Sequence, residues 1–172
     1  MKLRALAFSL ITTLFAAEPH SGNYGAEVVD SVQTTGLVRL NGTSVANAVQ
    51  VTGSLITLNA HIGTLDITGE ANLTGTIVKN SSTIMGSLQT IRSTFEQSIT
   101  ILTQKAVFTA SHLEGITVQQ DSGFKGKQVL ELKQGSVIHG PVHFESGKGE
   151  IVLYPGCKVL GPITGGKIVK KP

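Results

Sequence analysis

Pairs of apolar residues separated by one residue recur through the middle of the chain at a nearly constant interval. The first members of successive pairs are 16 or 17 residues apart. A unit of this length cannot bury its apolar side chains alone, so neighbouring units must stack on one another. This repeat constrains the fold more than any other feature. The pairs, in which Ser82 replaces one apolar member, are Val49/Val51, Leu65/Ile67, Ser82/Ile84, Ile99/Ile101 and Ile116/Val118.

The C-terminal third carries the same pattern in a longer unit. The segment "LELKQGSVIHGPVHF" (130–144) aligns with "IVLYPGCKVLGPITG" (151–165), and apolar, Gly and Pro positions agree throughout. Each copy contains a Gly-Pro, at 140–141 and at 161–162. Proline has no N–H to donate to a strand ladder, so the two Gly-Pro pairs are expected at the same corner of successive coils.

Three apolar columns per unit predict three short strands per coil. The sequence therefore predicts an all-β, single-stranded parallel β-helix (β-solenoid), right-handed and three-sided, with about seven coils. Phe108 and Phe124 are expected to stack in adjacent coils of the second column. The first column is extended to Leu130 and Ile151, the second contains Ile56, Leu73, Ile91, Phe108, Phe124, Ile138 and Val159, and the third contains Ile62, Val78, Phe95, Leu113, Phe144 and Ile163.

Two other β architectures fit the sequence less well. An antiparallel sandwich or barrel would show hairpin signals every 8–12 residues or so, but the chain has one Asn-Gly, at 41–42. A left-handed helix keeps a strict six-residue period, which only the stretch 67–78 resembles. Abundant Gly, Thr, Ser and Val disfavours helices and fits many short strands.

The N-terminus has the pattern of a secretory signal peptide. Lys2 and Arg4 precede a short apolar run, 5–15, which is followed by small residues. The run is shorter than the roughly 20 residues of a membrane span, so no transmembrane segment is expected in the mature chain. A buried apolar strand or helix is the alternative. The pattern predicts an exported protein that is periplasmic, envelope-associated or secreted.

The domain organisation follows from the repeat and the leader. We expect a signal peptide at 1–17, an N-terminal linker or cap at 18–35, a β-solenoid at 36–168 and a basic C-terminal tail at 169–172. The sole cysteine, Cys157, has no partner for an internal disulfide.

Patterns that carry catalytic or metal chemistry are weak in this chain. Asp66 lies between two inward positions and points outward without an acidic partner, whereas glycosidases need paired carboxylates. His139 and His143 flank a Gly-Pro corner and lack a third ligand for zinc. The sequence predicts no catalytic, cofactor-binding or metal-binding residue, no cofactor, no enzyme activity and no nucleic-acid partner. Ice binding would need Thr-x-Thr on successive coils, and only Thr74/Thr76 fits.

Charge is distributed unevenly along the chain. Residues 18–104 contain three Arg or Lys against six Asp or Glu, whereas residues 105–172 contain nine Lys against five Asp or Glu. In a solenoid the order of the sequence is the order along the rod, so one half is acidic and the other basic. Open strand edges at the ends promote further pairing, which predicts a head-to-tail homo-oligomer. A monomer capped by residues 18–35 and 165–172 is the alternative.

The units "VQVTGSL", "LDITGEA" and "ANLTGTI", within the range 36–168, resemble those of bactofilins, polymer-forming bacterial β-helix proteins. The resemblance implies a right-handed, three-sided β-helix that polymerises end to end without nucleotide. With the leader, it predicts an exported, non-catalytic structural β-solenoid that self-associates as an envelope or periplasmic scaffold. The alternative function is a surface or secreted adhesin-like module that contacts a protein or glycan partner, such as a host surface.

Overall fold

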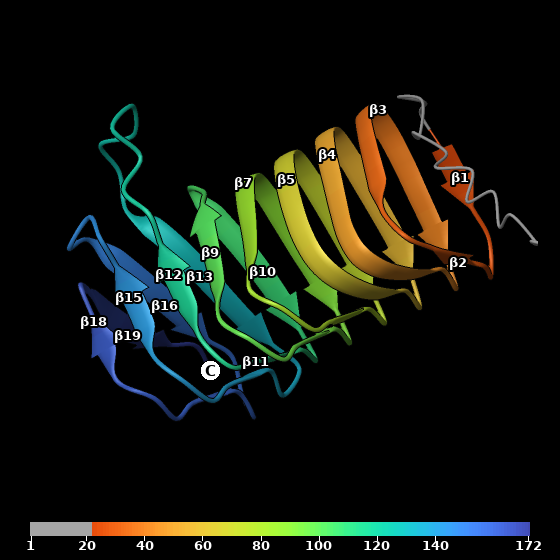
Figure 1. Ribbon diagram of the computed structural model, residues 1–172. Helices are drawn as coiled ribbons and strands as arrows, with labels where there is room; N and C mark the ends of the chain where they lie inside the picture. The colour runs from red at the N-terminus through yellow and green to blue at the C-terminus, as the bar shows by residue number, and fades with distance from the viewer. Residues whose placement is uncertain (1–21) are drawn as a thin grey trace, which may run out of the picture.

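The computed structural model describes residues 22–172, which form an all-β rod of stacked coils (Figure 1). Its 19 strands belong to one sheet, and the strand pairings within residues 22–172 are parallel, as for β3 with β4. The colour in Figure 1 runs from orange at β1 to blue at β19, so chain order is coil order. The predicted signal peptide, 1–17, lies outside the described residues.

Each coil contributes one strand to each of three ladders, which we call A, B and C, and several long strands run through more than one ladder. Ladder A contains parts of β3 (Val32–Asn41), β4 (Ser44–Leu58), β5 (His61–Thr74) and β7 (Ser82–Ile91), then β9 (Ile99–Leu102), β12 (Ile116–Val118), β15 (Val142–Phe144) and β18 (Ile163–Thr164). Ladder B contains β1 (Gly22–Tyr24), parts of β3, β4, β5 and β7, then β10 (Lys105–Thr109), β13 (Gln128–Lys133), β16 (Gly149–Leu153) and β19 (Gly166–Lys170). Ladder C contains β2 (Val28–Val29), the starts of β4 and β5, then β6 (Ile77–Val78), β8 (Thr94–Phe95), β11 (His112–Leu113), β14 (Val137–Ile138) and β17 (Lys158–Val159).

The three ladders confirm the predicted three-sided parallel β-solenoid. The rod has about 9 turns rather than about seven, because pairing begins at Gly22, two coils before Val49. The ladders therefore extend beyond the expected range 36–168 in both directions, up to Lys170 in β19.

The first apolar column is correct as far as β12. Val49 is in register with Leu65, Ser82 with Ile99, and Ile99 with Ile116, and all these side chains are buried inside the coils. Because side chains alternate between the two faces of a strand, each apolar-x-apolar pair places two residues in the core.

The continuation of that column is wrong beyond Val118. Ladder A continues to Val142 and Ile163, whereas Leu130 and Ile151 stand above Ala106 in ladder B. Residues 119–127 lie between β12 and β13 and project from the coils as a loop (Figure 1). This insertion lengthens one coil. Because the apolar-x-apolar pattern occurs in all three ladders, it does not show which ladder the strand after the loop joins.

The second column mixes different environments. Ile56 and Ile91 are exposed, and Leu55 and Leu88 take the inward positions. Phe124 is half-buried in the 119–127 loop, so the predicted stack with Phe108 is wrong. Phe108 is in register with Leu132 in the next coil and Thr90 in the preceding one, and Ile138 and Val159 belong to ladder C. The third column is correct through Leu113, but Phe144 and Ile163 belong to ladder A.

Glycine builds the corner between ladders A and B in the N-terminal coils. Gly36, Gly53, Gly69 and Gly86 stack with φ between 127° and 140°, a region that side chains disfavour. A Cβ on Gly69 would lie 2.0 Å from the carbonyl oxygen of Gly53, so the coils stack closely here only without a side chain.

The Gly-Pro pairs mark the corner between ladders C and A, as predicted. Ile138 and Val159, just before the two pairs, are in register, and so are Val142 and Ile163 just after them. The N–H of Val142 donates to the carbonyl of Pro162 at 2.9 Å. The proline carbonyl therefore accepts a hydrogen bond between coils, although its nitrogen has no N–H to donate.

The corner between ladders B and C has a left-handed residue in seven coils, followed closely by a small inward side chain. The left-handed residues, with φ between 49° and 82°, are Gly42, Asn59, Gly75, Arg92, Ala110, Gln134 and Gly156. The small inward residues form a column that we call the small-residue spine: Thr43, Ala60, Thr76, Ser93, Ser111, Ser136 and the half-buried Cys157. Hydroxyl groups of the spine satisfy backbone groups inside the rod, which compensates for burying them.

Candidate assembly interface

The last coil leaves strand edges without a partner. Within residues 22–172, β17 pairs with β14, β18 with β15 and β19 with β16, and each of the three terminal strands has one neighbour. Unpaired N–H and C=O groups along such edges can pair with a strand of another chain.

The inward side chains of this coil are less buried than those of the coils before it. Ile168 is 40% exposed, although Ile151, its register partner one coil earlier, is fully buried. Val159 and Ile163 are half-buried against the core, and the neighbouring Leu160 is 61% exposed. A further coil would bury this surface, and burial of apolar area favours association by about 25 cal/mol per Å².

Charged side chains distinguish the two ends. Lys158, Lys170 and Lys171 are exposed around the last coil. Lys170 is in register with the inward Leu153, so a cation stands where an apolar residue would continue the core. Exposed Glu27 and Asp30 flank β2 in the first coil. The end surfaces are therefore complementary in charge.

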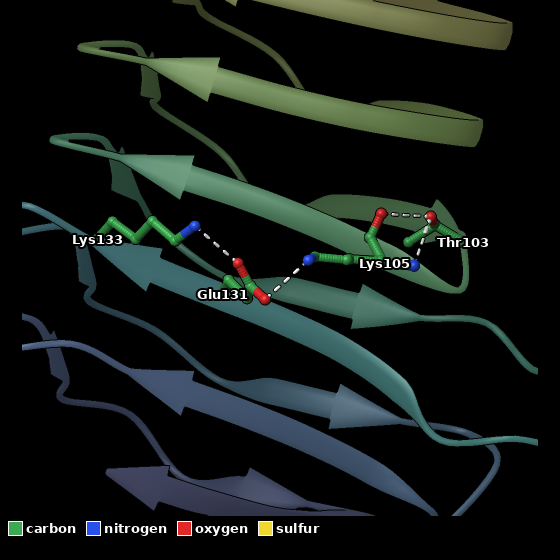
Figure 2. A network of polar contacts seen from close by, with 4 residues as sticks. All are labelled: Thr103, Lys105, Glu131 and Lys133. Carbon is green, nitrogen blue, oxygen red and sulfur yellow. Dashed lines mark hydrogen bonds and ion pairs between the residues drawn. The ribbon is translucent and has the colours of Figure 1, made fainter. Parts of the chain in front are cut away.

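A separate ionic network lies on the outer face of ladder B (Figure 2). Glu131 accepts from Lys105 at 2.8 Å and from Lys133 at 2.9 Å. Desolvation of the carboxylate raises the pKa of Glu131, but the hydrogen bonds and charges of both lysines outweigh it and lower the pKa below 4.5. The hydrogen bond to Glu131 raises the pKa of Lys133 above 10.5. The network links two neighbouring coils.

The histidines of the "HGPVH" segment do not converge. His139 stacks on His112 of the preceding coil with ring centroids 6.0 Å apart, whereas the Nδ1 of His143 hydrogen-bonds the Oγ1 of Thr164 at 2.6 Å. In the part of the chain that the structure describes, no group of three His, Cys, Asp or Glu side chains is placed to hold a metal ion.

Asp66 points outward, as predicted. It stands in ladder A between Gln50 and Thr83, and neither of these register partners is acidic.

Cys157 follows Ser136 in the small-residue spine and packs against the core. The spine was missed in the sequence. Its signal was a small residue, Ser or Thr in five of the seven coils, that recurs soon after the left-handed corner at intervals of 16–25 residues.

No helix among residues 22–172 has the length and hydropathy needed to cross a membrane.

The terminal coil combines open strand edges, partly exposed core residues and a charge opposite to that of the first coil. A scan against protein-family models and searches of curated proteins and of solved structures found no match to this chain.

Proposed function

We propose that this protein is an exported, non-catalytic structural β-solenoid that associates with itself end to end in the cell envelope or periplasm. The observation that carries the proposal is the last coil, whose three strands each have a free edge and whose inward Ile168 is 40% exposed. The solenoid architecture is compatible with the polymer-forming bactofilins, which the repeat units resemble.

The proposed contact places the last coil of one copy against the first coil of the next. The free edge of β19 then meets β1, which pairs with β3 among the described strands. Because the contact joins two different surfaces, it is heterologous and yields an open filament when the rotation does not close a ring.

Lys170 gives this contact selectivity. An inward cation prevents indiscriminate pairing of a strand edge, because burying its charge is unfavourable. A carboxylate of the correct partner compensates for that charge. Glu27, near the start of ladder C in the first coil, is positioned at the corner that follows ladder B. Exposed charges of this kind steer orientation more than they add affinity.

Electron microscopy and light scattering of the full chain test the proposal. We expect rods or filaments that form more slowly when salt rises from about 20 mM to about 500 mM, since screening then weakens the exposed charge pairs that orient the two ends. Ile168→Lys should abolish assembly by charging the end surface. The matched control is Ile56→Lys, the same change at an exposed position within the rod. A wild-type monomer at every salt and at high concentration would contradict self-association.

A charge exchange tests the direction of the contact. Lys170→Glu with Lys171→Glu should prevent assembly, and combining them with Glu27→Lys and Asp30→Lys should restore it. Restoration requires the two ends to meet in a head-to-tail manner. If the quadruple variant stays monomeric while the wild type assembles, the proposed pairing of ends is wrong.

Export is a separate element of the proposal and has its own test. Cleavage of the leader should leave a mature protein that begins near residue 18. Mass spectrometry of the protein from its native host checks this, and an intact segment 1–17 would contradict export by this route.

A further inference from the structure

A groove of about 550 Å³ lies at the corner between ladders A and B in the last three coils. Three short segments line it, 125–127, 147–149 and 165–167, which lie at or just before the starts of β13, β16 and β19. Gln128, Gly149 and Gly166 are in register, so the segments stack along the rod.

The floor of the groove is glycine. A Cβ on Gly149 would lie 2.0 Å from the ring of Phe144, and one on Gly166 would lie 2.6 Å from it. Phe144 is fully buried beneath this corner, so only glycine fits above it. Both glycines therefore pack directly against the Phe144 ring, and neither contributes a side chain to the groove.

Four lysines and no carboxylate line the groove. Lys125, Lys127, Lys148 and Lys167 are all exposed. Lys127 pairs with Glu150 at 3.2 Å, and the other three make no ion pair within residues 22–172. Elsewhere on the rod, one carboxylate pairs with two lysines, as Figure 2 shows for Glu131.

We propose that this groove binds an anionic polysaccharide. Stacked coils are about 4.8 Å apart, so the lysines are spread along the rod axis and suit a ligand whose negative charges repeat along its length. The lining contains no aromatic residue on which bases could stack and no Arg fork for bidentate recognition, which disfavours a nucleic acid. The inference does not require self-association, because all three segments that line the groove belong to one chain.

Isothermal titration calorimetry of the full chain tests the binding. The probes are heparin, which is sulfated, polygalacturonate, which is carboxylated, neutral dextran and an oligodeoxythymidylate. We expect binding to the two anionic polysaccharides that weakens as salt rises, and no binding to dextran. The triple variant Lys125→Gln/Lys148→Gln/Lys167→Gln should lose about tenfold in affinity, because three charge contacts are removed.

The control variant removes three positive charges elsewhere. Arg39→Gln/Lys79→Gln/Arg92→Gln changes the net charge equally, and all three side chains are exposed in the N-terminal half. It should leave the affinity within about twofold if the groove is the site. Circular dichroism verifies that each variant folds, and the Ile168→Lys background separates binding from assembly.

Three results would overturn the proposal: equal weakening in the groove and control variants, tighter binding of the oligodeoxythymidylate than of either polysaccharide, and no binding to any anionic probe. The first would show an effect of net charge alone. The second would assign the groove to nucleic acid.

Discussion

The backbone N–H of Ser93 donates a hydrogen bond to the hydroxyl oxygen of Ser111 in the next coil, 3.2 Å away. The same contact joins Thr76 to Ser93 at 3.2 Å and Ser111 to Ser136 at 3.1 Å. The small-residue spine therefore connects four successive coils from the inside, where the ladders leave corner N–H groups without a strand partner. Buried polar groups that form such a chain stabilise one stacking register.

Ser111→Ala tests the spine. The substitution leaves the Ser93 N–H and the Thr90 hydroxyl, which donates to Ser111 at 3.0 Å, without their acceptor. Ala60 shows that the column accommodates a methyl group, so the loss comes from hydrogen bonding. We expect the unfolding free energy to fall by about 1–3 kcal/mol in urea denaturation. Ser87→Ala, on the exposed face of β7, is the control and should change it by less than about 0.5 kcal/mol.

Gly69→Ala tests the glycine corner. Its φ of 134° and the 2.0 Å approach of the Gly53 carbonyl both oppose a side chain, so we expect a loss on the order of 3 kcal/mol. Gly135→Ala has a φ of 77° but no atom within 4 Å, and should lose only about 1 kcal/mol. Thermal and chemical denaturation compare the two. Equal losses would mean that the close stacking of coils at Gly69 is not what requires glycine.

Phe108 and Phe124 should behave differently when truncated. Phe108 is fully buried in ladder B, so Phe108→Ala should lower the unfolding free energy by about 3–5 kcal/mol through lost burial and a cavity. Phe124→Ala, in the loop 119–127, should lower it by less than about 1 kcal/mol. Denaturant titrations of both variants measure this. A large loss for Phe124→Ala would place that ring in the core.

Glu131→Gln should reduce stability in a pH-dependent way. Because the native pKa of Glu131 is lowered, its charge interactions stabilise the fold above pH 4.5, and this contribution disappears as pH falls through the lower native pKa. The interaction also weakens at high pH, as pH rises through the raised pKa of Lys133. We expect a difference from wild type of about 1 kcal/mol at neutral pH.

The control is Glu114→Gln, since Glu114 is exposed and makes no ion pair in the described part of the chain. Thermal unfolding of both variants and the wild type from acid to neutral pH measures the contribution. A constant difference for Glu131→Gln across that range would show that its charge is not what stabilises the two neighbouring coils.

Much of the core was readable from the sequence because inward positions in regular coils are apolar and alternate. The column from Val49 to Ile116 and the Gly-Pro corner were predicted in their correct places. Ile56 and Ile91 were misplaced because the neighbouring inward residues, Thr57 and Thr90, are polar. These threonines are buried because their hydroxyls bond Thr76 and Ser111 of the spine.

The assignment after Val118 failed for a different reason. Leu130 and Ile151 have the same apolar-x-apolar form as the residues of ladder A, but they belong to ladder B. The sequence of the inserted loop 119–127 does not indicate which of the three ladders the strand after it joins. Only the pairing of β13 with β10 defines that position.

The sequence by itself determined that the chain forms a three-sided stack of parallel coils, since alternation within a strand and a repeat of about 17 residues are local properties. The tertiary structure decided which ladder each strand after the loop 119–127 joins and which polar residues point inward. It also decided where the lysines of the groove lie close together. Those features depend on contacts between residues one coil apart, such as Ser93 with Ser111 or Phe144 with Gly166. A hydroxyl is stable in the core only when it has a hydrogen-bond partner, and the Ser111 hydroxyl finds such partners both in its own coil and in the preceding one.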